Sequence, residues 1–318
     1  MTEGLEDVSI SRDKKSLTWG IAVPGDKDQV MYVWFEAVIN YITALVDDES
    51  IDKWLEIEEI REDTEAQILD QIRQQMPINF HYLGKDIAKF HLVIWIAMLV
   101  ALELPLTEVS YVHGFINDGE GRKFSKSLGN GVLPGELIER FGVEGARFVM
   151  FYEINQGDDT NFDLVKSSID YNTNLADKLG NLLMRVTTLI AKHLDGIIDI
   201  DYLAVNPSAE QDLVIDLKDC YGYLENFEVN KSIKELFIQV AKLNQYLEQT
   251  KPWTLAKDFE KNRDEITKIL TLTATQTIEV AKALSIFMPA TGEKIYEILN
   301  DERVVKAKPL FTKIKLES

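Results

Sequence analysis

A short polar stretch, residues 121–130, carries the side chains best suited to chemistry in this sequence. It reads Gly-Arg-Lys-Phe-Ser-Lys-Ser-Leu-Gly-Asn, so that Lys123 and Lys126 lie between two glycines with serines beside them. Lysine is a compact charge on a flexible stem, and glycine lets the backbone approach an anion closely. Two ammonium groups and exposed backbone N–H groups in this lysine loop suit a polyphosphate. Taken alone, a solvated surface loop is the simpler explanation, because short motifs often occur by chance.

Three apolar stretches must position the lysine loop and other reactive groups. Each leads into a loop or a helix, and each is predicted as a buried strand: residues 30–35, 78–86 and 108–116. Ligands of open α/β sheets bind beyond the carboxyl ends of the strands. We therefore expect Trp34, Asp86, His113 and the lysine loop at one edge of a single parallel sheet.

The residues after the second stretch allow two interpretations. Asp86 could accept both hydroxyls of a ribose, or it could cap the apolar helix predicted over residues 87–102. Ile87 and His91 are four residues apart and share one face of that helix. A histidine on an apolar helix is more often a core residue than a catalyst. In the third stretch, Gly114 would let a flat ring lie close to the backbone beside His113.

From residue 162 onward the pattern is almost wholly helical. The predicted helices span residues 162–194, 209–225, 229–249, 253–258, 260–287 and 290–299. This pattern favours a helix bundle appended to an α/β domain. Asn181 and Arg185 lie one turn apart on the first helix, and Trp253 begins a later one. Arginine and tryptophan can stack on unpaired bases, although a core anchor and a surface charge are the simpler alternatives.

Composition limits the classes of protein that fit. The 318 residues have a net charge of −19, which argues against non-specific binding to nucleic acid but leaves room for a local basic surface. The single cysteine, Cys220, excludes an intrachain disulfide and a cysteine-cluster zinc site within these residues. No apolar run approaches the ~20 residues that span a bilayer, so we expect a cytoplasmic protein that does not bind a membrane.

Residues 123–127, Lys-Phe-Ser-Lys-Ser, resemble the second signature of class I aminoacyl-tRNA synthetases, usually Lys-Met-Ser-Lys-Ser. Further segments are similar to the methionyl-tRNA synthetase family in particular. They are Tyr-Val-Trp-Phe-Glu-Ala at 32–37, Leu-Gly-Lys-Asp-Ile at 83–87, Phe-His at 90–91, His-Gly-Phe at 113–115, Asn-Leu-Leu-Met-Arg at 181–185 and Thr-Lys-Pro-Trp at 250–253. Together the similar segments extend over nearly the whole chain.

The resemblance implies a fold and its division into domains. Residues 1–130 would form the second half of a class I catalytic Rossmann-like domain, with an acidic helical insertion at about 47–76. Connector helices would occupy residues 131–161, and a helical anticodon-binding domain residues 162–318. The fold class is therefore α/β followed by all-α.

The resemblance also implies a reaction, in which methionine is activated with ATP and joined to tRNA(Met). Lys126 and, secondarily, Lys123 would stabilise the leaving pyrophosphate of ATP, which arrives with Mg²⁺. The ATP-binding residues would be Gly84, Asp86, His113, Gly114 and Lys126. Methionine would be bound by Trp34, Ala37, Val38, Tyr41, Ile87 and His91. The CAU anticodon would be read by Asn181, Arg185 and Trp253.

Two features of the family are absent from the sequence. The first class I signature, His-Ile-Gly-His, does not occur, and neither does the cysteine-bearing zinc insertion of many members. We therefore expect a fragment or one part of a split enzyme, which is inactive or nearly so without the N-terminal catalytic half. Robust ATP–pyrophosphate exchange by these residues alone would contradict this expectation.

Three alternatives remain open. The chain could be a tRNA-binding module without catalysis, or a class I synthetase for another apolar amino acid, with isoleucine, valine, leucine or cysteine as candidates. A purely structural helical scaffold is the third, but it leaves the groups at the strand ends unexplained.

Overall fold

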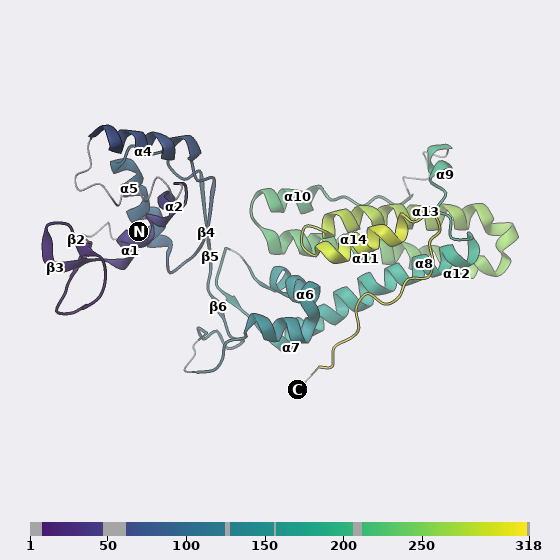
Figure 1. The fold of residues 1–318 in the computed structure, drawn as a ribbon. Coiled ribbons are helices and arrows are strands. Elements are labelled where there is room, and N and C mark those ends of the chain that lie inside the picture. Colours follow the sequence, from purple (N-terminus) through teal and green to yellow (C-terminus); the bar gives the residue numbers. More distant parts are fainter. Residues whose placement is uncertain (1–7, 47–61, 125–127, 156, 206–211, 317–318) are drawn as a thin grey trace. The chain divides into compact units, whose positions relative to one another are not determined.

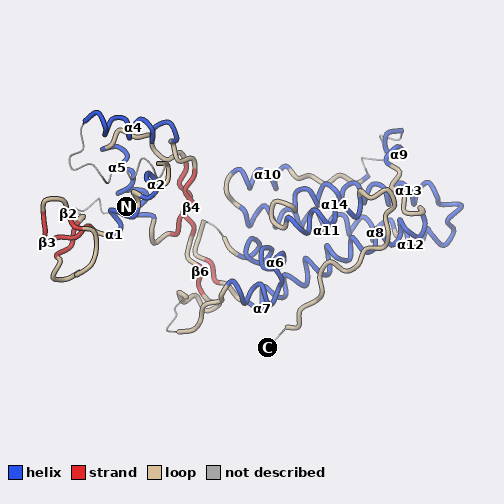
Figure 2. Tube along the Cα trace, in the orientation of Figure 1, coloured by secondary structure: helices blue, strands red, loops and turns tan. Residues whose placement is uncertain are grey.

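The structure is a computed structural model that describes residues 8–46, 62–124, 128–155, 157–205 and 212–316. The chain divides into two compact units, residues 1–113 and 114–318, which are described separately below. Figures 1 and 2 show strands and short helices in the first unit and a long helical bundle in the second.

The first unit begins with a small antiparallel sheet in the order β1-β3-β2. Its strands are β1 (Ser11–Asp13), β2 (Ala22–Val23) and β3 (Asp26–Met31). Pro24 and Gly25 connect β2 to β3, and Gly25 has the positive φ (81°) that such a tight turn requires. Residues 8–31 therefore place no side chain at the edge of a parallel sheet.

The strand predicted over residues 30–35 is wrong in its extent and in its sheet. The chain leaves β3 after Met31, turns at the extended Tyr32, and enters helices α1 (Val33–Ala37) and α2 (Asn40–Thr43). Trp34 therefore lies on a helix, and β3 pairs antiparallel with its neighbours. A run of β-branched and aromatic residues fits a buried helix start as well as a strand, so composition could not separate the two.

A parallel pair of strands forms the other sheet of the first unit. Strands β4 (Phe80–Gly84) and β5 (Val109–His113) pair in register, with Gly84 opposite His113. The intervening chain forms the wide-turned helix η1 (Phe90–Ile94) and α5 (Trp95–Ala101). The third predicted strand thus ends at His113, three residues earlier than predicted. Of the predicted three-stranded parallel sheet, only the β4–β5 pair is present among the described residues.

Helix α4 (Glu62–Gln75) belongs to the predicted acidic insertion, whose residues 47–61 lie outside the described part of the chain. It is not merely a solvated helix, because Ile72 is buried in a small core with Val38 and Trp95. This core also contains Ile42 of α2 and Leu99 of α5, so it packs α2, α4 and α5 against one another.

The second unit starts with a short parallel pair, β6 (Ile116–Asn117) and β7 (Thr160–Asn161). Between them lie the lysine loop and α6 (Pro134–Glu153), which is kinked at Gly142 (φ 70°), where the sequence predicts a stop. Helix α7 (Leu164–Tyr171) follows, capped by Asp163, whose carboxylate accepts from two backbone N–H groups.

The rest of the second unit is a helix bundle, as predicted. Its elements are η2 (Asn172–Gly180), α8 (Asn181–His193), α9 (Ile200–Val205), α10 (Lys218–Glu225), α11 (Val229–Thr250), α12 (Pro252–Leu255), η4 (Ala256–Asp258), α13 (Phe259–Leu284) and α14 (Pro289–Leu299). On α11 the apolar residues at 233, 236, 240, 243 and 247 recur at helical spacing and are all buried. None of the described helices has the length and apolar character needed to cross a membrane.

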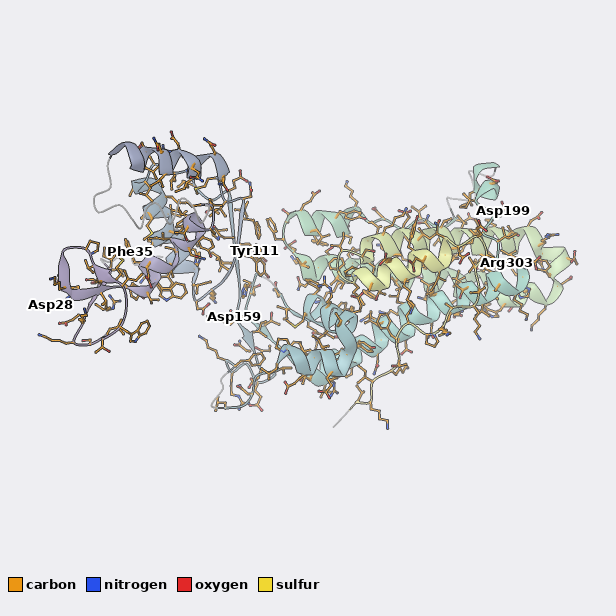
Figure 3. The ribbon with its side chains drawn as sticks, in the orientation of Figure 1. Asp28, Phe35, Tyr111, Asp159, Asp199 and Arg303 are labelled. Atoms are coloured by element: carbon orange, nitrogen blue, oxygen red, sulfur yellow. The ribbon has the colours of Figure 1, made fainter. Side chains whose placement is uncertain are left out.

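After α14 the chain forms a strap, residues 301–316, that runs back along α8 and η2 without helical structure (Figure 1, yellow). Nε of Arg303, labelled in Figure 3, donates to the carbonyl of Asp195 at 2.8 Å, and the Ala307 N–H donates to Oγ1 of Thr187 at 3.0 Å. Near its end, the backbone of Ile314 exchanges two hydrogen bonds with the side-chain amide of Asn172. The strap therefore covers one side of the bundle from α8 to the start of η2.

Candidate functional site

A carboxylate and a ring converge at the carboxyl ends of β4 and β5 in the first unit. A Cβ built on Gly84 would lie 2.7 Å from Oδ1 of Asp86 and 3.6 Å from Nε2 of His113. The His113 ring also stacks on Tyr82 (centroids 5.2 Å apart), which stacks in turn on Tyr111. Three of the predicted nucleotide-binding residues therefore lie together, and any side chain at position 84 would push Asp86 away.

An aromatic cluster occupies the corner between α1, α2 and η1. The Tyr41 hydroxyl lies 2.9 Å from Nε2 of His91, and the other ring nitrogen, Nδ1, lies 3.0 Å from the carbonyl oxygen of Ile87. A carbonyl only accepts, so Nδ1 carries the hydrogen. In the neutral ring, Nε2 then accepts the hydrogen of the Tyr41 hydroxyl. His91 is thus a satisfied, buried residue whose tautomer is fixed by its neighbours.

Three further residues of the predicted methionine pocket, Trp34, Ala37 and Val38, lie on α1 or at its end. The Trp34 ring lies flat on Phe90, with centroids 4.5 Å apart and an interplanar angle of 5°. Val38 is buried in the small core, whereas Ala37 is exposed. The corner offers flat aromatic rings and few hydrogen-bond donors, which suits an apolar, polarizable side chain.

His81, on β4, adds a second histidine that the sequence-based site did not contain. Its ring meets Tyr41 edge-on at 4.6 Å and His91 at 5.5 Å. Burial, and then the charge of His91, lower the pKa of His81. The lowered pKa favours the neutral form of the His81 ring.

The lysine loop belongs to the second unit and is described at both ends. Lys126, the residue predicted to contact the leaving group, lies with residues 125 and 127 outside the described part of the chain. Lys123 is exposed, and its ammonium lies 4.1 Å from the centroid of the Phe115 ring. A buried carboxylate, that of Asp118, holds the loop at its base.

Gly114 begins the second unit and packs against a backbone segment. A Cβ at this position would lie 2.2 Å from the carbonyl carbon and oxygen of Asp158. The Phe115 N–H donates to Oδ1 of Asp159, labelled in Figure 3, at 2.9 Å, which holds the two segments together. Gly114 therefore has a packing reason for being glycine in addition to its predicted place beside a nucleotide.

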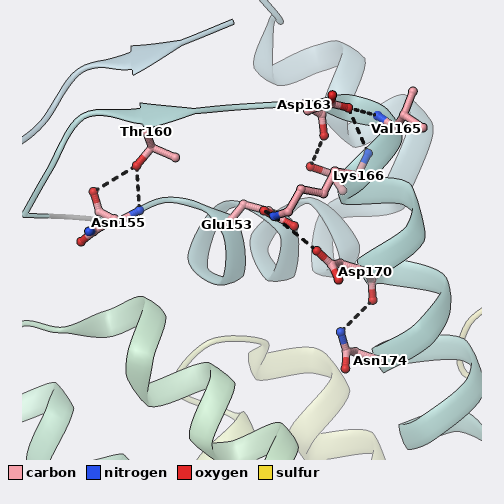
Figure 4. A network of polar contacts seen from close by, with 9 residues as sticks. Glu153, Asn155, Thr160, Asp163, Val165, Lys166, Asp170 and Asn174 are labelled. Carbon is pink, nitrogen blue, oxygen red and sulfur yellow. Dashed lines mark hydrogen bonds and ion pairs between the residues drawn. The ribbon is translucent and has the colours of Figure 1, made fainter. Parts of the chain in front are cut away.

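An ionic network joins α6 to α7 next to the β6–β7 pair (Figure 4), with the Glu153 side chain buried and Lys166 exposed. Lys166 pairs with Oε2 of Glu153, and the same ammonium lies 3.6 Å from Oδ2 of Asp170. The other carboxylate oxygen of Glu153 is buried without a hydrogen-bond partner among the described residues. Burial, followed by the neighbouring carboxyl of Asp170, outweighs the Lys166 charge and raises the pKa of Glu153 to about 7.

The free energy of unfolding of the unchanged chain should fall as pH rises, because Glu153 ionises. In Glu153→Gln this pH-dependent fall should be absent. The pKa of Glu153 is raised from 4.5 to about 7 on folding, so its ionisation opposes folding between these values. From pH 5 to pH 7, the Tm of the unchanged chain should fall relative to that of the variant by roughly 4 to 8 °C, the effect of about 2 kcal/mol. Thermal unfolding at both pH values measures this difference, and an equal difference at the two would contradict it.

In the helical bundle, two residues far apart in sequence meet. The Arg185 guanidinium lies 4.6 Å from the centroid of the Trp253 ring, and its Nη2 donates to Oε1 of Glu248 at 2.8 Å. Beside them is a cavity of about 440 Å³ lined by Met184, Arg185, Thr188, Leu189, Trp253 and Lys306. Asn181 is exposed one turn earlier on α8. A half-buried indole, two cations and an apolar wall can accept an unstacked base and its phosphate.

Several residues of these sites carry no recognisable signal in the sequence. Glu248 is one of many acidic residues, and Lys306 lies in a segment without a motif. Among the described residues, no group of three His, Cys, Asp or Glu side chains is placed to hold a metal ion.

Comparison with protein families matches most of the chain. The model of tRNA synthetases class I (M) matches residues 1–187, and that of the anticodon-binding domain of tRNA ligase matches residues 213–317. The lysine loop, the β4–β5 groups and Arg185 fall in the first match, and Trp253 and Lys306 fall in the second.

Individual relatives agree with these models. The methionine–tRNA ligase of Caldanaerobacter subterraneus subsp. tengcongensis is 35% identical over 304 residues, which cover 93% of this chain and 43% of that protein. The methionine–tRNA ligase of Bacillus subtilis is 32% identical over 341 residues, covering 99% and 47%. The Mycobacterium tuberculosis methionyl-tRNA synthetase bound by methionyl-adenylate has a TM-score of 0.73 at 28% identity and covers 100% of this chain and 60% of that one. The chain spans less than half the length of these two curated relatives.

Proposed function

Because this chain belongs to the methionyl-tRNA synthetase family of class I tRNA synthetases, we propose that it supplies part of the site that activates methionine with ATP and the site that recognises tRNA(Met). The observation that carries the proposal is the placement of Arg185 on Trp253 at the mouth of a cavity of about 440 Å³. This pairing joins residues from the two family matches, and an apolar cavity beside cations is suited to an unstacked base and its phosphate.

In the first step, a carboxylate oxygen of methionine attacks the α-phosphorus of ATP, a new O–P bond forms, and pyrophosphate leaves. The enzyme contributes mainly position and charge to such a transfer. In the proposal, Asp86, beside Gly84, accepts hydrogen bonds from the ribose hydroxyls, while His113 and Gly114 flank the adenine. Lys126 and Lys123 stabilise the charge that develops on pyrophosphate.

Methionine is proposed to bind in the corner between α1, α2 and η1. Tyr41 and His91 satisfy each other by a hydrogen bond of 2.9 Å, so they present ring edges to the substrate and not an unpaired donor. A thioether next to aromatic rings gains about 0.3–1.5 kcal/mol. Trp34, Ala37, Val38 and Ile87 complete the pocket in this proposal.

In the second step, a hydroxyl of the terminal adenosine of the tRNA attacks the methionyl carbonyl, and AMP leaves. Asn181, Arg185 and Trp253 would hold anticodon bases and so select the tRNA. Mg²⁺ would arrive with ATP, coordinated mainly by its phosphates. We place the reaction in the cytoplasm.

The His-Ile-Gly-His signature is not among these 318 residues. We therefore propose that other residues contact the ATP phosphates from the side opposite to Lys123 and Lys126. The test is methionine-dependent ATP–pyrophosphate exchange by the full-length gene product, with leucine, isoleucine, valine and cysteine as competing substrates. We expect exchange with methionine to exceed that with each of the others by at least about tenfold, given the 1–3 kcal/mol by which an apolar pocket separates similar side chains. Binding of tRNA(Met) without exchange would instead identify a non-catalytic module.

A further inference from the structure

The turn that leads into the lysine loop is organised by one carboxylate, that of Asp118. Its Oδ1 accepts hydrogen bonds from the backbone N–H groups of Glu120 (3.0 Å) and Arg122 (2.8 Å). Its Oδ2 accepts from Arg122 Nε and Asn130 Nδ2, both at 2.8 Å. The residue is buried, with 8% of its surface exposed. These bonds, that of Asn130 above all, lower the pKa of Asp118 to about 2, so it is ionised throughout the physiological range.

Two of these bonds are those of an ordinary turn, and two are not. An aspartate commonly accepts from N–H groups two to four residues later, as Asp118 does from Glu120 and Arg122. The bonds from Arg122 Nε and Asn130 Nδ2 extend further and connect the two sides of the lysine loop. A turn alone does not require a contact with a residue twelve positions later in the chain.

The same contacts fix the backbone of Lys123. Asn130 Nδ2 donates a second bond to the Lys123 carbonyl oxygen at 3.2 Å, and Asn117 pairs with Lys123 as an isolated antiparallel bridge. The Asp118 N–H donates to the Arg122 carbonyl oxygen at 2.8 Å. Lys123 is therefore held from the side of β6 by backbone bonds and from the side of Asn130, whose amide is itself held by the Asp118 carboxylate.

We propose that Asp118 is a positioning residue for adenylate formation, because it joins Arg122 to Asn130 and so fixes the base from which Lys123 reaches the phosphates of ATP. This inference rests on the proposed function. A lysine on an unrestrained backbone loses conformational freedom when it binds an anion, and that loss opposes binding. With its base already fixed, the loop loses less of this freedom when ATP binds.

Asp118→Asn in the full-length gene product tests the proposal. In the variant, the side-chain NH₂ group would face Arg122 Nε and Asn130 Nδ2, two donors that now bond to the carboxylate. These donors would lose their acceptor, and the two sides of the loop would separate. We expect kcat/KM for ATP in pyrophosphate exchange to fall about tenfold, with KM for methionine within about twofold of its original value. Glu120→Gln is the matched control, because it removes one negative charge from the same turn but alters an exposed side chain whose ion pair with Arg122 lies outside the four bonds. Its kinetics should remain near those of the unchanged protein.

A double-mutant cycle separates positioning from a general effect on folding. If Asp118 acts through Lys123, Asp118→Asn should reduce kcat/KM for ATP by less than about twofold in a Lys123→Ala background. Fully additive losses, or an equal rise in KM for methionine, would overturn the proposal. If Asp118→Asn yields little folded protein, Asn130→Ala, which removes one of the four bonds, should still reduce kcat/KM for ATP about threefold while KM for methionine stays constant.

The outcome distinguishes this inference from the function on which it rests. Equal exchange rates for the unchanged protein and for Asp118→Asn would overturn only the role of Asp118. Absence of methionine-dependent exchange in the unchanged full-length protein would overturn the proposed function and this inference with it.

Discussion

Replacing Trp253 with alanine is expected to raise the Kd for tRNA(Met) by about 10- to 100-fold, because stacking of one base on an aromatic ring contributes about 1–3 kcal/mol. Methionine-dependent exchange should stay within about twofold, since that step needs no tRNA. Arg185→Ala should act in the same direction, because the guanidinium that lies on the indole is lost. Filter binding with tRNA(Met) and pyrophosphate exchange measure the two effects in the full-length protein.

The contacts that now hold Arg185 are too weak to prevent a base from entering. Its ion pair with Glu248 is largely exposed, and such pairs contribute about 0–1 kcal/mol. The contact with the indole adds about 0.5–1 kcal/mol at a site of this kind. Tyr221→Ala, which removes an exposed aromatic ring from α10 of the same bundle, is the control and should leave Kd unchanged. Equal losses of tRNA binding and exchange after Trp253→Ala would contradict the assignment.

Gly114→Ala is expected to destabilise the second unit by about 3 kcal/mol, at the upper end of the range for overpacking. The new Cβ would lie 2.2 Å from backbone atoms of Asp158 and 2.5 Å from the nitrogen of Asp159. Neither segment moves easily, because the Phe115 N–H bonds to Asp159 and the Thr160 N–H donates to the Phe115 carbonyl oxygen at 2.8 Å. A fall in Tm of roughly 6 to 12 °C should follow.

Thermal unfolding of the chain measures this effect, and Gly222→Ala is its control. A Cβ at Gly222, inside α10, meets nothing within 4 Å, so alanine there should be neutral or stabilise by up to about 1 kcal/mol. An unchanged Tm of Gly114→Ala would show that the segment at Asp158 can move to make room for the methyl group. Nucleotide binding would then be the remaining reason for glycine at this position.

The helical bundle could be predicted from sequence because its signals are long and repeated. Helix α11 was predicted over residues 229–249 and spans Val229–Thr250, since its apolar residues recur at a fixed spacing over six turns. The start of α1 could not be predicted in the same way. Trp34 stands in a run, residues 30–35, in which five of six residues are β-branched or aromatic. Only the antiparallel pairing of β3 with β1 and β2 decides where the strand ends.

For the sites, too, sequence spacing indicates some of the contacts, and only the three-dimensional structure shows the others. Arg185 and Trp253 are 68 positions apart, so a resemblance could bring them together but helical periodicity could not. Asp118 lies in the segment Asn-Asp-Gly at 117–119, and nothing in this segment distinguishes it from other aspartates in turns. Its second role depends on the distance to Asn130, which no local pattern specifies.

The strap has a consequence for the order in which the second unit folds. Its bonds join residues separated by 108, 120 and 142 positions along the chain. Closing such long loops is entropically costly, so these contacts form after the local helices. Until then Thr187 and the side of α8 that the strap covers stay in contact with water. A partly folded chain is therefore most open to proteases and to association with other chains along this one face of the bundle.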